Sequence, residues 1–497
     1  MMKKVKEIFR NKYTIYFMAI LLIGFFLRIY KAQELFLYGH DQELTGWFIR
    51  DVLVNGHLRL IGQETSTAGV FIGPFYYYLS IPFYLLAKFD PIGGVWLVTL
   101  LGIISLISVY YVVGRTFGQL EALISTLIYS ASFYMVFNDR EVVPTMPVIL
   151  WTVWFIFGLQ LLVEKKTKKA MLVFGILTAL IWHLNFALIL TLPLIPIAII
   201  LTSRKANKRE MGVYLGTTAA LSLPLILFEI KHNFIQTKAI IASLTTNQHD
   251  VVMGYDKLIR VIYLMSKDVY GLFMGNLDYF SYGKVLFFLL AVFVLLKLGK
   301  KITKFWFTIF LLWIALFITF FATYSKIVSE YYLNGTMIVF IIIASLFITT
   351  LLKSKDLAHW GAIVVGMFLV FNLNKFFTIN INASGYVEKK ALVYEIKDDM
   401  RKHGYPCFAI SYITDPGYNL GYRYFFWLYG LHVNHPDSGS PVYTIVYPLN
   451  DMFKVDKTFG ALGLIYPNFA SYTKEAVDQS CAGENSNITD PMWGLTQ

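Results

Sequence analysis

The sequence is poor in charged residues and almost free of cysteine. Of its 497 residues, 15% are charged and 57% are hydrophobic, whereas soluble proteins carry about a quarter charged residues. This shortage excludes an ordinary soluble enzyme. With only two cysteines, Cys407 and Cys481, the chain has neither a disulfide framework nor a paired-cysteine zinc site. Both lie in the C-terminal region, so they could form one bridge or stay apart.

Hydrophobic residues gather instead into runs long enough to cross a bilayer, which takes about 20 residues. The first run, Tyr13 to Tyr30, follows a basic segment and has no small-residue cleavage site, which predicts an uncleaved first helix. Further runs cover residues 92–113, 120–137, 142–163, 170–184, 186–201, 213–228, 285–298, 305–324, 333–352 and 359–377. The sequence therefore predicts an α-helical polytopic membrane protein with about eleven crossings.

Basic clusters predict the orientation of these helices. The net charge is +12, but the lysines and arginines lie in short groups beside hydrophobic runs, which is typical of cytoplasmic loops and not of a nucleic-acid partner. Clusters at 165–169 and 204–209 flank residues 170–201, and both stay cytoplasmic if that stretch is two short helices with a tip near His183 and Asn185. The N-terminus is then cytoplasmic, and residues 31–91, 138–141 and 229–282 and the tail lie on the other side of the plasma membrane.

The tail differs in composition from the rest of the chain. Residues 378–497 carry 9 Lys+Arg and 12 Asp+Glu, a net charge of −3, so residues 1–377 carry +15. Helix-like stretches at 391–403 and 417–429 alternate with strand-like runs at 408–413, 442–447 and 462–466. We therefore predict a transmembrane catalytic domain over 1–377 and a small extracytoplasmic α/β domain over 378–497.

Two acidic clusters on the predicted outer face are candidates for catalysis. Asp41 and Glu43 follow the first helix by about ten residues, and Asp139 and Glu141 lie in a very short loop. Carboxylates at an interface are most often solvated, but charges held this close to hydrocarbon usually line a cavity or a pathway. The four could provide a general base, and Asp41, Asp139 and Glu141 could hold a divalent ion such as Mg²⁺ or Mn²⁺. No other cofactor is expected.

Cations at the same level could bind phosphate. Arg140 offers a planar donor that suits a phosphate group, and Lys231 and His232 open the next outer loop. A lysine and a histidine at a membrane boundary are equally well explained as a snorkelling pair. Glu330 and Tyr331 lie at the outer mouth of a later helix and are further candidates for substrate binding.

An aromatic run at residues 73–84, GPFYYYLSIPFY, includes Tyr76 and is interrupted by proline. It is too broken for a crossing and suits helices in the membrane interface, where tyrosine rings prefer to lie. Such helices would either shape the entrance for a lipid-linked substrate or form an ordinary aromatic belt.

These features together resemble the GT-C membrane glycosyltransferases. The acidic pair in the first outer loop, the proline-led aromatic run, the second acidic motif and the outer α/β tail resemble the branch of the protein O-mannosyltransferases and the lipid A aminoarabinose transferase, glycosyltransferase family 39. The resemblance covers roughly residues 1 to 380. It implies transfer of a hexose or pentose from a polyprenyl-phosphate donor to a hydroxyl of a lipid, glycan or protein, on the non-cytoplasmic face and with inversion.

The resemblance also implies roles for individual residues. Asp41 matches the aspartate taken as the catalytic base, and Glu43 stands near its acidic companion, while Asp139 and Glu141 match the second acidic motif. Arg140, Lys231 and His232 resemble ligands of the carrier phosphate. Two departures weaken an assignment to protein acceptors: Gln42 separates the first two acids, and Gly73 replaces the first proline of the aromatic motif.

Two other functions compete with this interpretation. A transporter or flippase for lipid-linked sugars would need polar residues near the bilayer midplane and commonly shows internal repeats, but most ionisable residues here lie on one face and no repeat is seen. An oligosaccharide polymerase or ligase would be expected to centre on arginines in a large outer loop, whereas acids dominate the first outer loop of this chain. Glycosyl transfer is therefore the favoured function.

Overall fold

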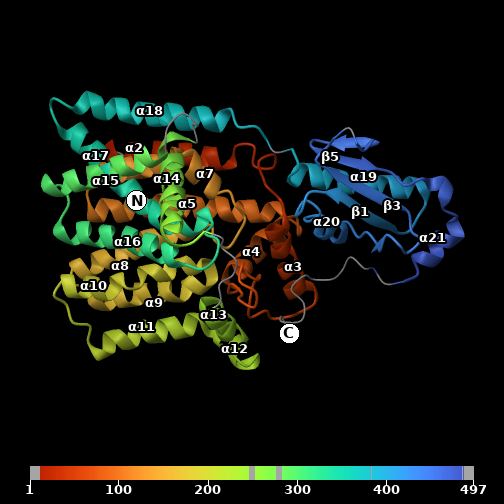
Figure 1. Cartoon of the computed structure of the whole chain (residues 1–497), viewed down its shortest axis with the longest axis horizontal. Coiled ribbons are helices and arrows are strands. Elements are labelled where there is room, and N and C mark those ends of the chain that lie inside the picture. Colours follow the sequence, from red (N-terminus) through yellow and green to blue (C-terminus); the bar gives the residue numbers. More distant parts are fainter. Residues whose placement is uncertain are drawn as a thin grey trace, which may run out of the picture.

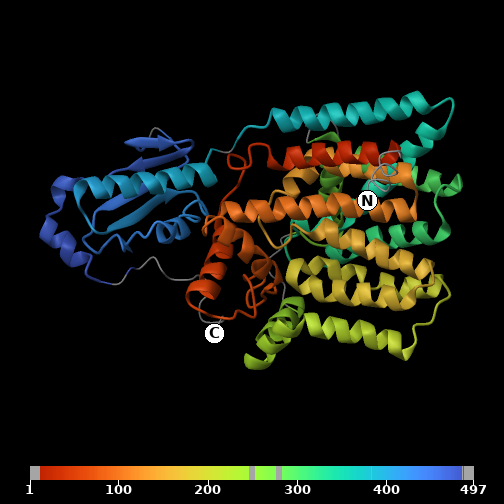
Figure 2. The same cartoon turned by 180° about the vertical axis from the view of Figure 1, so that it is seen from behind.

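The computed structural model describes residues 12–245, 252–275, 282–381, 383–450, 452–483 and 485. The basic residues 3–10 that precede the first helix lie outside these ranges, as do parts of the predicted outer loop 229–282. Figures 1 and 2 show long helices lying side by side in one bundle, with a separate sheet-containing unit at one end of it. Two short helices, α3 (His40–Val54) and α4 (Phe75–Leu86), lie between the bundle and the sheet.

Most helices of the bundle follow the hydrophobic runs of the sequence, but two of them lie within residues 229–282, which the sequence predicted as an outer loop. The helices of the bundle are α2 (Lys12–Ile29), α5 (Ile92–Thr116), α6 (Gln119–Ala131), α7 (Phe133–Asn138), α8 (Val148–Val163), α9 (Thr167–Leu184), α10 (Leu194–Leu201), α11 (Lys208–Leu221), α12 (Leu223–Lys231), α13 (Ile235–Thr245), α14 (Gly254–Met274), α15 (Tyr282–Leu298), α16 (Lys304–Thr323), α17 (Met337–Lys353) and α18 (Ala358–Phe377). Two 3₁₀ segments join them, η1 (Phe186–Thr191) and η2 (Glu330–Thr336).

Six helices in the described ranges are long and apolar enough to cross a membrane, or seven if the bent pair α11 and α12 forms one span. This is the arrangement of a multi-pass membrane protein. The predicted number of eleven crossings is not confirmed, because several hydrophobic runs do not form one long helix. The run 120–137 breaks at Ser132, and the run 213–228 bends by 61° between α11 and α12. Residues before Val148 form turns around two prolines, so α8 has only 16 residues.

The predicted break between residues 170 and 201 is present. Helix α9 ends at Leu184, and the side chain of Asn185 caps η1 by accepting a hydrogen bond from the backbone N–H of Ala187, at 2.9 Å. An asparagine at such a position competes with the helix for backbone hydrogen bonds. This explains why a stretch of 32 mostly apolar residues does not continue as one helix.

The C-terminal unit is a small α/β fold, as its alternating pattern predicts. Its elements are α19 (Tyr386–His403), β1 (Phe408–Thr414), α20 (Arg423–Leu428), β2 (Val433–Asn434), β3 (Val442–Tyr447), β4 (Lys457–Phe459), β5 (Leu462–Ile465), η3 (Phe469–Ser471) and α21 (Lys474–Ser480). The strand order is β2-β1-β3-β5-β4, with β2, β1 and β3 parallel and β5 antiparallel to both neighbours. A disulfide joins Cys407 to Cys481, so the bridge that the sequence left open is formed.

Two hydrophobic cores hold the molecule together. The larger one lies inside the helical bundle. The second one is shared, because it combines side chains of α3, α4 and α5 with side chains of α19, β1, α20 and β3. A shared core of this kind fixes the C-terminal unit on α3 and α4, at the end of the bundle where the first acidic motif begins.

Candidate active site

A cavity of about 1130 Å³ opens within this end of the bundle. Its walls come from the segment 63–72, α7, the turn around Asn185, the end of α16 and η2. The lining combines apolar side chains with polar and charged ones. The apolar residues include Ile181, Leu184, Phe186, Leu190, Phe320, Phe321 and Val328, and the polar residues include Asp41, Glu64, Tyr134, Asn138, Glu141, Arg260, Glu330, Tyr331 and Asn334.

A second cavity of about 440 Å³ lies between the bundle and the C-terminal unit. The start of α19 and the loop that follows β1 contribute Ser384, Lys389 and Tyr418 from one side. The carboxyl ends of parallel strands are where open α/β sheets usually bind ligands, and this cavity lies beside the end of β1. We refer to the two spaces as the main cavity and the second cavity.

Asp41 lines both cavities. It lies in the first turn of α3, where the helix dipole favours a negative side chain, and its side chain is exposed. Gln63 Nε2 donates a hydrogen bond to Asp41 Oδ1 at 3.3 Å, and the hydroxyl of Tyr77 donates to Gln63 Oε1 at 2.9 Å. Tyr77 belongs to the aromatic run at 73–84, so this run holds Gln63 in place against the carboxylate.

Glu141 also lines both cavities. Its side chain is open to the cavity space, yet protein surrounds it, and burial together with the nearby Asp41 carboxylate raises its pKa. Two carboxylates that share one site disfavour simultaneous ionisation. Asp41 and Glu141 therefore meet as the sequence predicts, at the boundary between the two cavities.

Glu43 is directed away from this boundary, although the sequence placed it with Asp41. The side chain is 2% exposed and accepts hydrogen bonds from the backbone N–H groups of Gly421, at 3.0 Å, and Tyr424, at 2.7 Å. Successive positions of a helix turn by about 100°, so residues two apart face different sides. Glu43 thus connects α3 to the C-terminal unit and lines neither cavity.

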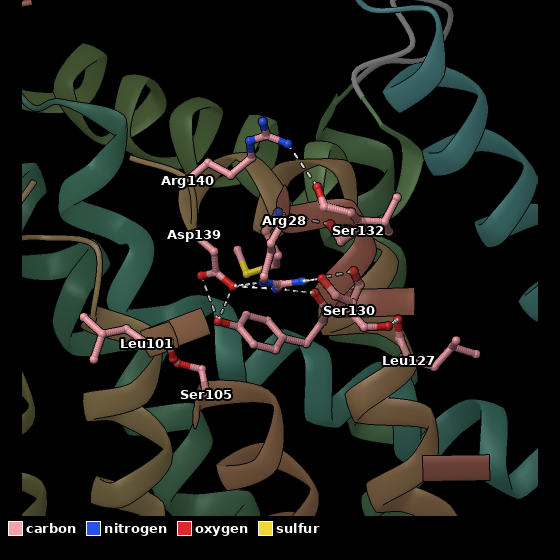
Figure 3. A network of polar contacts seen from close by, with 12 residues as sticks. Arg28, Leu101, Ser105, Leu127, Ser130, Ser132, Asp139 and Arg140 are labelled. Carbon is pink, nitrogen blue, oxygen red and sulfur yellow. Dashed lines mark hydrogen bonds and ion pairs between the residues drawn. The ribbon is translucent and has the colours of Figure 1, made fainter. Parts of the chain in front are cut away.

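Asp139 likewise does not join Glu141. It is 1% exposed and pairs with Arg28 of α2, whose Nε donates to Asp139 Oδ2 at 2.9 Å. The Tyr129 hydroxyl lies 2.8 and 2.7 Å from the two carboxylate oxygens. Figure 3 shows the Asp139 carboxylate directed at Arg28, while the Arg140 side chain points away from this pair. Asp139 is therefore part of a buried ion pair inside the bundle.

The predicted metal site is not assembled. The sequence predicted that Asp41, Asp139 and Glu141 form this site, but Asp139 is paired with Arg28. Within the described ranges, no three His, Cys, Asp or Glu side chains come together in a way that could hold a metal ion. The three-carboxylate site that the sequence predicted is therefore not formed, and we assign no step to a metal.

The three predicted phosphate ligands do not line the main cavity. Arg140 lines the second cavity, and its Nη atoms donate to the backbone carbonyls of Leu27 and Lys31. Lys231 and His232 end α12 and line neither cavity; the His232 ring stacks on Phe228 with ring centroids 4.3 Å apart.

The remaining predicted substrate residues are divided. Glu330 and Tyr331 line the main cavity, and Glu330 pairs with Lys267 at 2.6 Å. Tyr76 is 1% exposed in the shared core and lines neither cavity. Its neighbour Tyr77 lines neither cavity either, but its hydroxyl holds Gln63.

Gly73 explains one departure from the family motif. Its backbone N–H donates to the carbonyl of Trp182 at 2.8 Å, and an added Cβ would lie 2.1 Å from Nδ1 of His183. A proline at this position would have no N–H to donate and no room for its ring. The glycine therefore allows the aromatic run to pack closely on the tip that follows α9.

Sequence reasoning missed several residues of the site. Gln63 lies in a loop without a motif, and Asn138 and Asn334 belong to no motif of their own. They have no local signal, because their roles depend on contacts between segments about 200 residues apart, as in the hydrogen bonds of Asn334 with Tyr134 and Asn138.

Comparisons with known proteins agree with this architecture. Residues 72–228, which contain the aromatic run and the second acidic motif, match the sequence-family model described as Dolichyl-phosphate-mannose-protein mannosyltransferase. No curated protein matches the sequence.

Among solved structures, ArnT from Cupriavidus metallidurans bound to undecaprenyl phosphate is similar at 12% identity, over 92% of this chain and 98% of that chain, with a TM-score of 0.58. Its apo state matches over the same shares at the same identity, with a TM-score of 0.59. The apo oligosaccharyltransferase of Archaeoglobus fulgidus matches at 14% identity over 84% of this chain and 64% of that chain, with a TM-score of 0.49. The resemblance to the GT-C membrane glycosyltransferases is thereby confirmed, through a segment that matches their mannosyltransferase family and through the fold that the chain shares with ArnT.

Proposed function

We propose that the chain is an inverting GT-C glycosyltransferase that moves a sugar from a polyprenyl-phosphate donor to a hydroxyl of a lipid, glycan or protein acceptor. The position of Asp41 carries this proposal. A base for glycosyl transfer must reach both substrates, and Asp41 lies where the main cavity and the second cavity meet. The orientation with the site and the C-terminal unit outside the cytoplasm is part of the same proposal and rests on the basic clusters.

The main cavity suits the donor. Its volume of about 1130 Å³ exceeds the roughly 300 to 1,000 Å³ of ordinary small-molecule sites, and its apolar side chains suit a prenyl chain. Undecaprenyl phosphate is the bound molecule of the similar ArnT structure, which supports a lipid phosphate as donor. Arg260 lines the main cavity, and we assign to it the charge stabilisation of the phosphate in place of Arg140, Lys231 and His232.

The second cavity suits the acceptor. An acceptor hydroxyl placed there donates its proton to the Asp41 carboxylate while its oxygen bonds to the anomeric carbon. The anomeric carbon–oxygen bond breaks at the same time, and its electron pair leaves with the polyprenyl phosphate. Attack from the second cavity on a sugar held in the main cavity brings the hydroxyl to the face opposite the phosphate, and the anomeric configuration inverts.

Transfer measured in reconstituted vesicles tests this proposal. With polyprenyl-phosphate sugars extracted from the native membrane, Asp41→Asn should lower transfer by about 10² to 10⁴, the contribution of a positioned base, and should leave binding of polyprenyl phosphate unchanged. Glu34→Gln is the matched control, because it neutralises an exposed carboxylate of the same outer loop that lines neither cavity. An Asp41→Asn protein that transfers sugar at the parental rate would refute the assignment of the base.

A further inference from the structure

Three polar side chains of the main cavity form one hydrogen-bonded cluster. Tyr134 and Asn138 of α7 and Asn334 of η2 lie together on one side of the cavity, and we call these three residues the amide wall. Glu330 lines the cavity from the same 3₁₀ segment as Asn334. The prenyl chain of a donor has no hydrogen-bonding groups, so it cannot form hydrogen bonds with the amide wall.

A continuous chain of hydrogen bonds fixes the amide wall. The Tyr134 hydroxyl donates to Asn334 Oδ1 at 2.7 Å, and Asn334 Nδ2 donates to Asn138 Oδ1 at 2.9 Å. Each amide is thereby held in one orientation. Groups that are oriented before binding lose little freedom when they bind a ligand, which is what recognition of hydroxyl groups requires.

A buried acid lies behind the wall. Asp268 of α14 is 1% exposed, it faces the Tyr134 hydroxyl, and neither of its carboxyl oxygens has a hydrogen bond of ordinary geometry among the described residues. Buried polar groups without such partners are rare in folded proteins. Burial disfavours the charged form of Asp268, and Glu330 is paired with Lys267, so neither acid presents an unpaired negative charge to the cavity.

The wall is continuous with the reaction centre. The backbone N–H of Glu141 donates to the carbonyl of Asn138 at 3.4 Å, and Glu141 meets Asp41 at the boundary of the two cavities. A group bound to the amide wall therefore lies close to the proposed base. The sugar of a lipid-linked donor must occupy that place.

We propose that the amide wall is the subsite that binds the sugar of the donor through the hydroxyl groups of that sugar. Amide and hydroxyl side chains match the alternating donors and acceptors of sugar hydroxyls. The inference rests on the proposed function, because it presupposes a lipid-linked sugar in the main cavity.

Binding measurements separate the sugar from its carrier. The probes are polyprenyl phosphate alone and a panel of polyprenyl-phosphate hexoses and pentoses. For the parental protein, a sugar should tighten binding relative to the sugar-free carrier. Tyr134→Phe and Asn334→Ala should each reduce this sugar-dependent gain by about three- to tenfold, the effect of losing one or two hydrogen bonds. The Kd for polyprenyl phosphate alone should stay within about twofold of the parental value.

Tyr110→Phe is the matched control. The Tyr110 hydroxyl donates to a side-chain amide oxygen, that of Gln119, at 2.9 Å, as Tyr134 does to Asn334, but neither residue lines a cavity. The Tyr110→Phe protein should show the same sugar-dependent gain in binding affinity as the parental protein. Because Tyr134→Phe keeps the ring in the core, it tests the proposal even if Asn334→Ala fails to fold.

Unchanged sugar-dependent gains in a folded Tyr134→Phe protein would overturn the sugar subsite and leave the proposed function intact. A parental protein that binds polyprenyl phosphate but gains nothing from any sugar would also overturn it. A parental protein that binds neither the carrier nor any donor would refute the proposed function itself.

Discussion

Glu43 allows the sharpest separation between a structural and a catalytic role. Glu43→Ala would leave the backbone N–H groups of Gly421 and Tyr424 without an acceptor inside a closed interface. Each unsatisfied buried donor costs about 1 to 3 kcal/mol, which gives about 2 to 6 kcal/mol for the two. Part of this loss is offset, because the variant no longer has to bury a carboxylate. The cost of that burial also raises the pKa of Glu43. We expect a net loss of about 2 to 4 kcal/mol in the free energy of unfolding.

Thermal unfolding of the purified protein in detergent measures this loss, and limited proteolysis shows whether the C-terminal unit is released first. Glu43→Gln should be intermediate, because its amide nitrogen faces one of the two N–H groups. Glu388→Gln is the control, since Glu388 accepts a single N–H bond from Gly385 within the C-terminal unit. Polyprenyl phosphate should bind the Glu43 variants normally, because Glu43 lines neither cavity. A Glu43→Gln protein with parental stability and a hundredfold loss of transfer would restore the catalytic role that the sequence suggested.

Three further predictions concern stability. Arg28→Met or Asp139→Leu alone should cost about 3 to 5 kcal/mol in the free energy of unfolding, because each leaves a buried charge unpaired. The double variant should recover most of this loss in thermal unfolding. Additive losses in the double variant would contradict the buried ion pair. Removing the disulfide with Cys407→Ser should cost about 4 kcal/mol, since it closes a loop of 74 residues, and denaturant unfolding with and without reductant measures it. Burial lowers the pKa of Lys389 to about 8 from 10.5. Between these two pH values the folded protein loses the ammonium proton of Lys389, while the unfolded chain keeps it. Stability should therefore rise by about 1.4 kcal/mol per pH unit between these values relative to Lys389→Met, and parallel pH profiles would exclude the shift.

Local and periodic signals in the sequence determined much of the architecture. Apolar runs, the break at Asn185 and the alternating tail pattern each depend on a few neighbouring residues, because a helix or strand is specified by its own periodicity. Asp41 could also be found from sequence, since a carboxylate just beyond the first helix stands out in a chain with so few charges. The number of crossings could not be read in this way, because Ser132, Ser222 and the prolines before α8 break runs that hydropathy alone joins.

Tertiary structure alone decided which side chain faces which partner. Asp41 and Glu43 lie two residues apart in one short motif, but the helix that begins at His40 turns one toward the cavities and the other toward Gly421 and Tyr424. The amide wall was equally hidden, because Tyr134 and Asn334 are 200 residues apart. A sequence fixes the residues that are present and the elements that they form, whereas the direction of each side chain follows from the packing of elements distant in the chain.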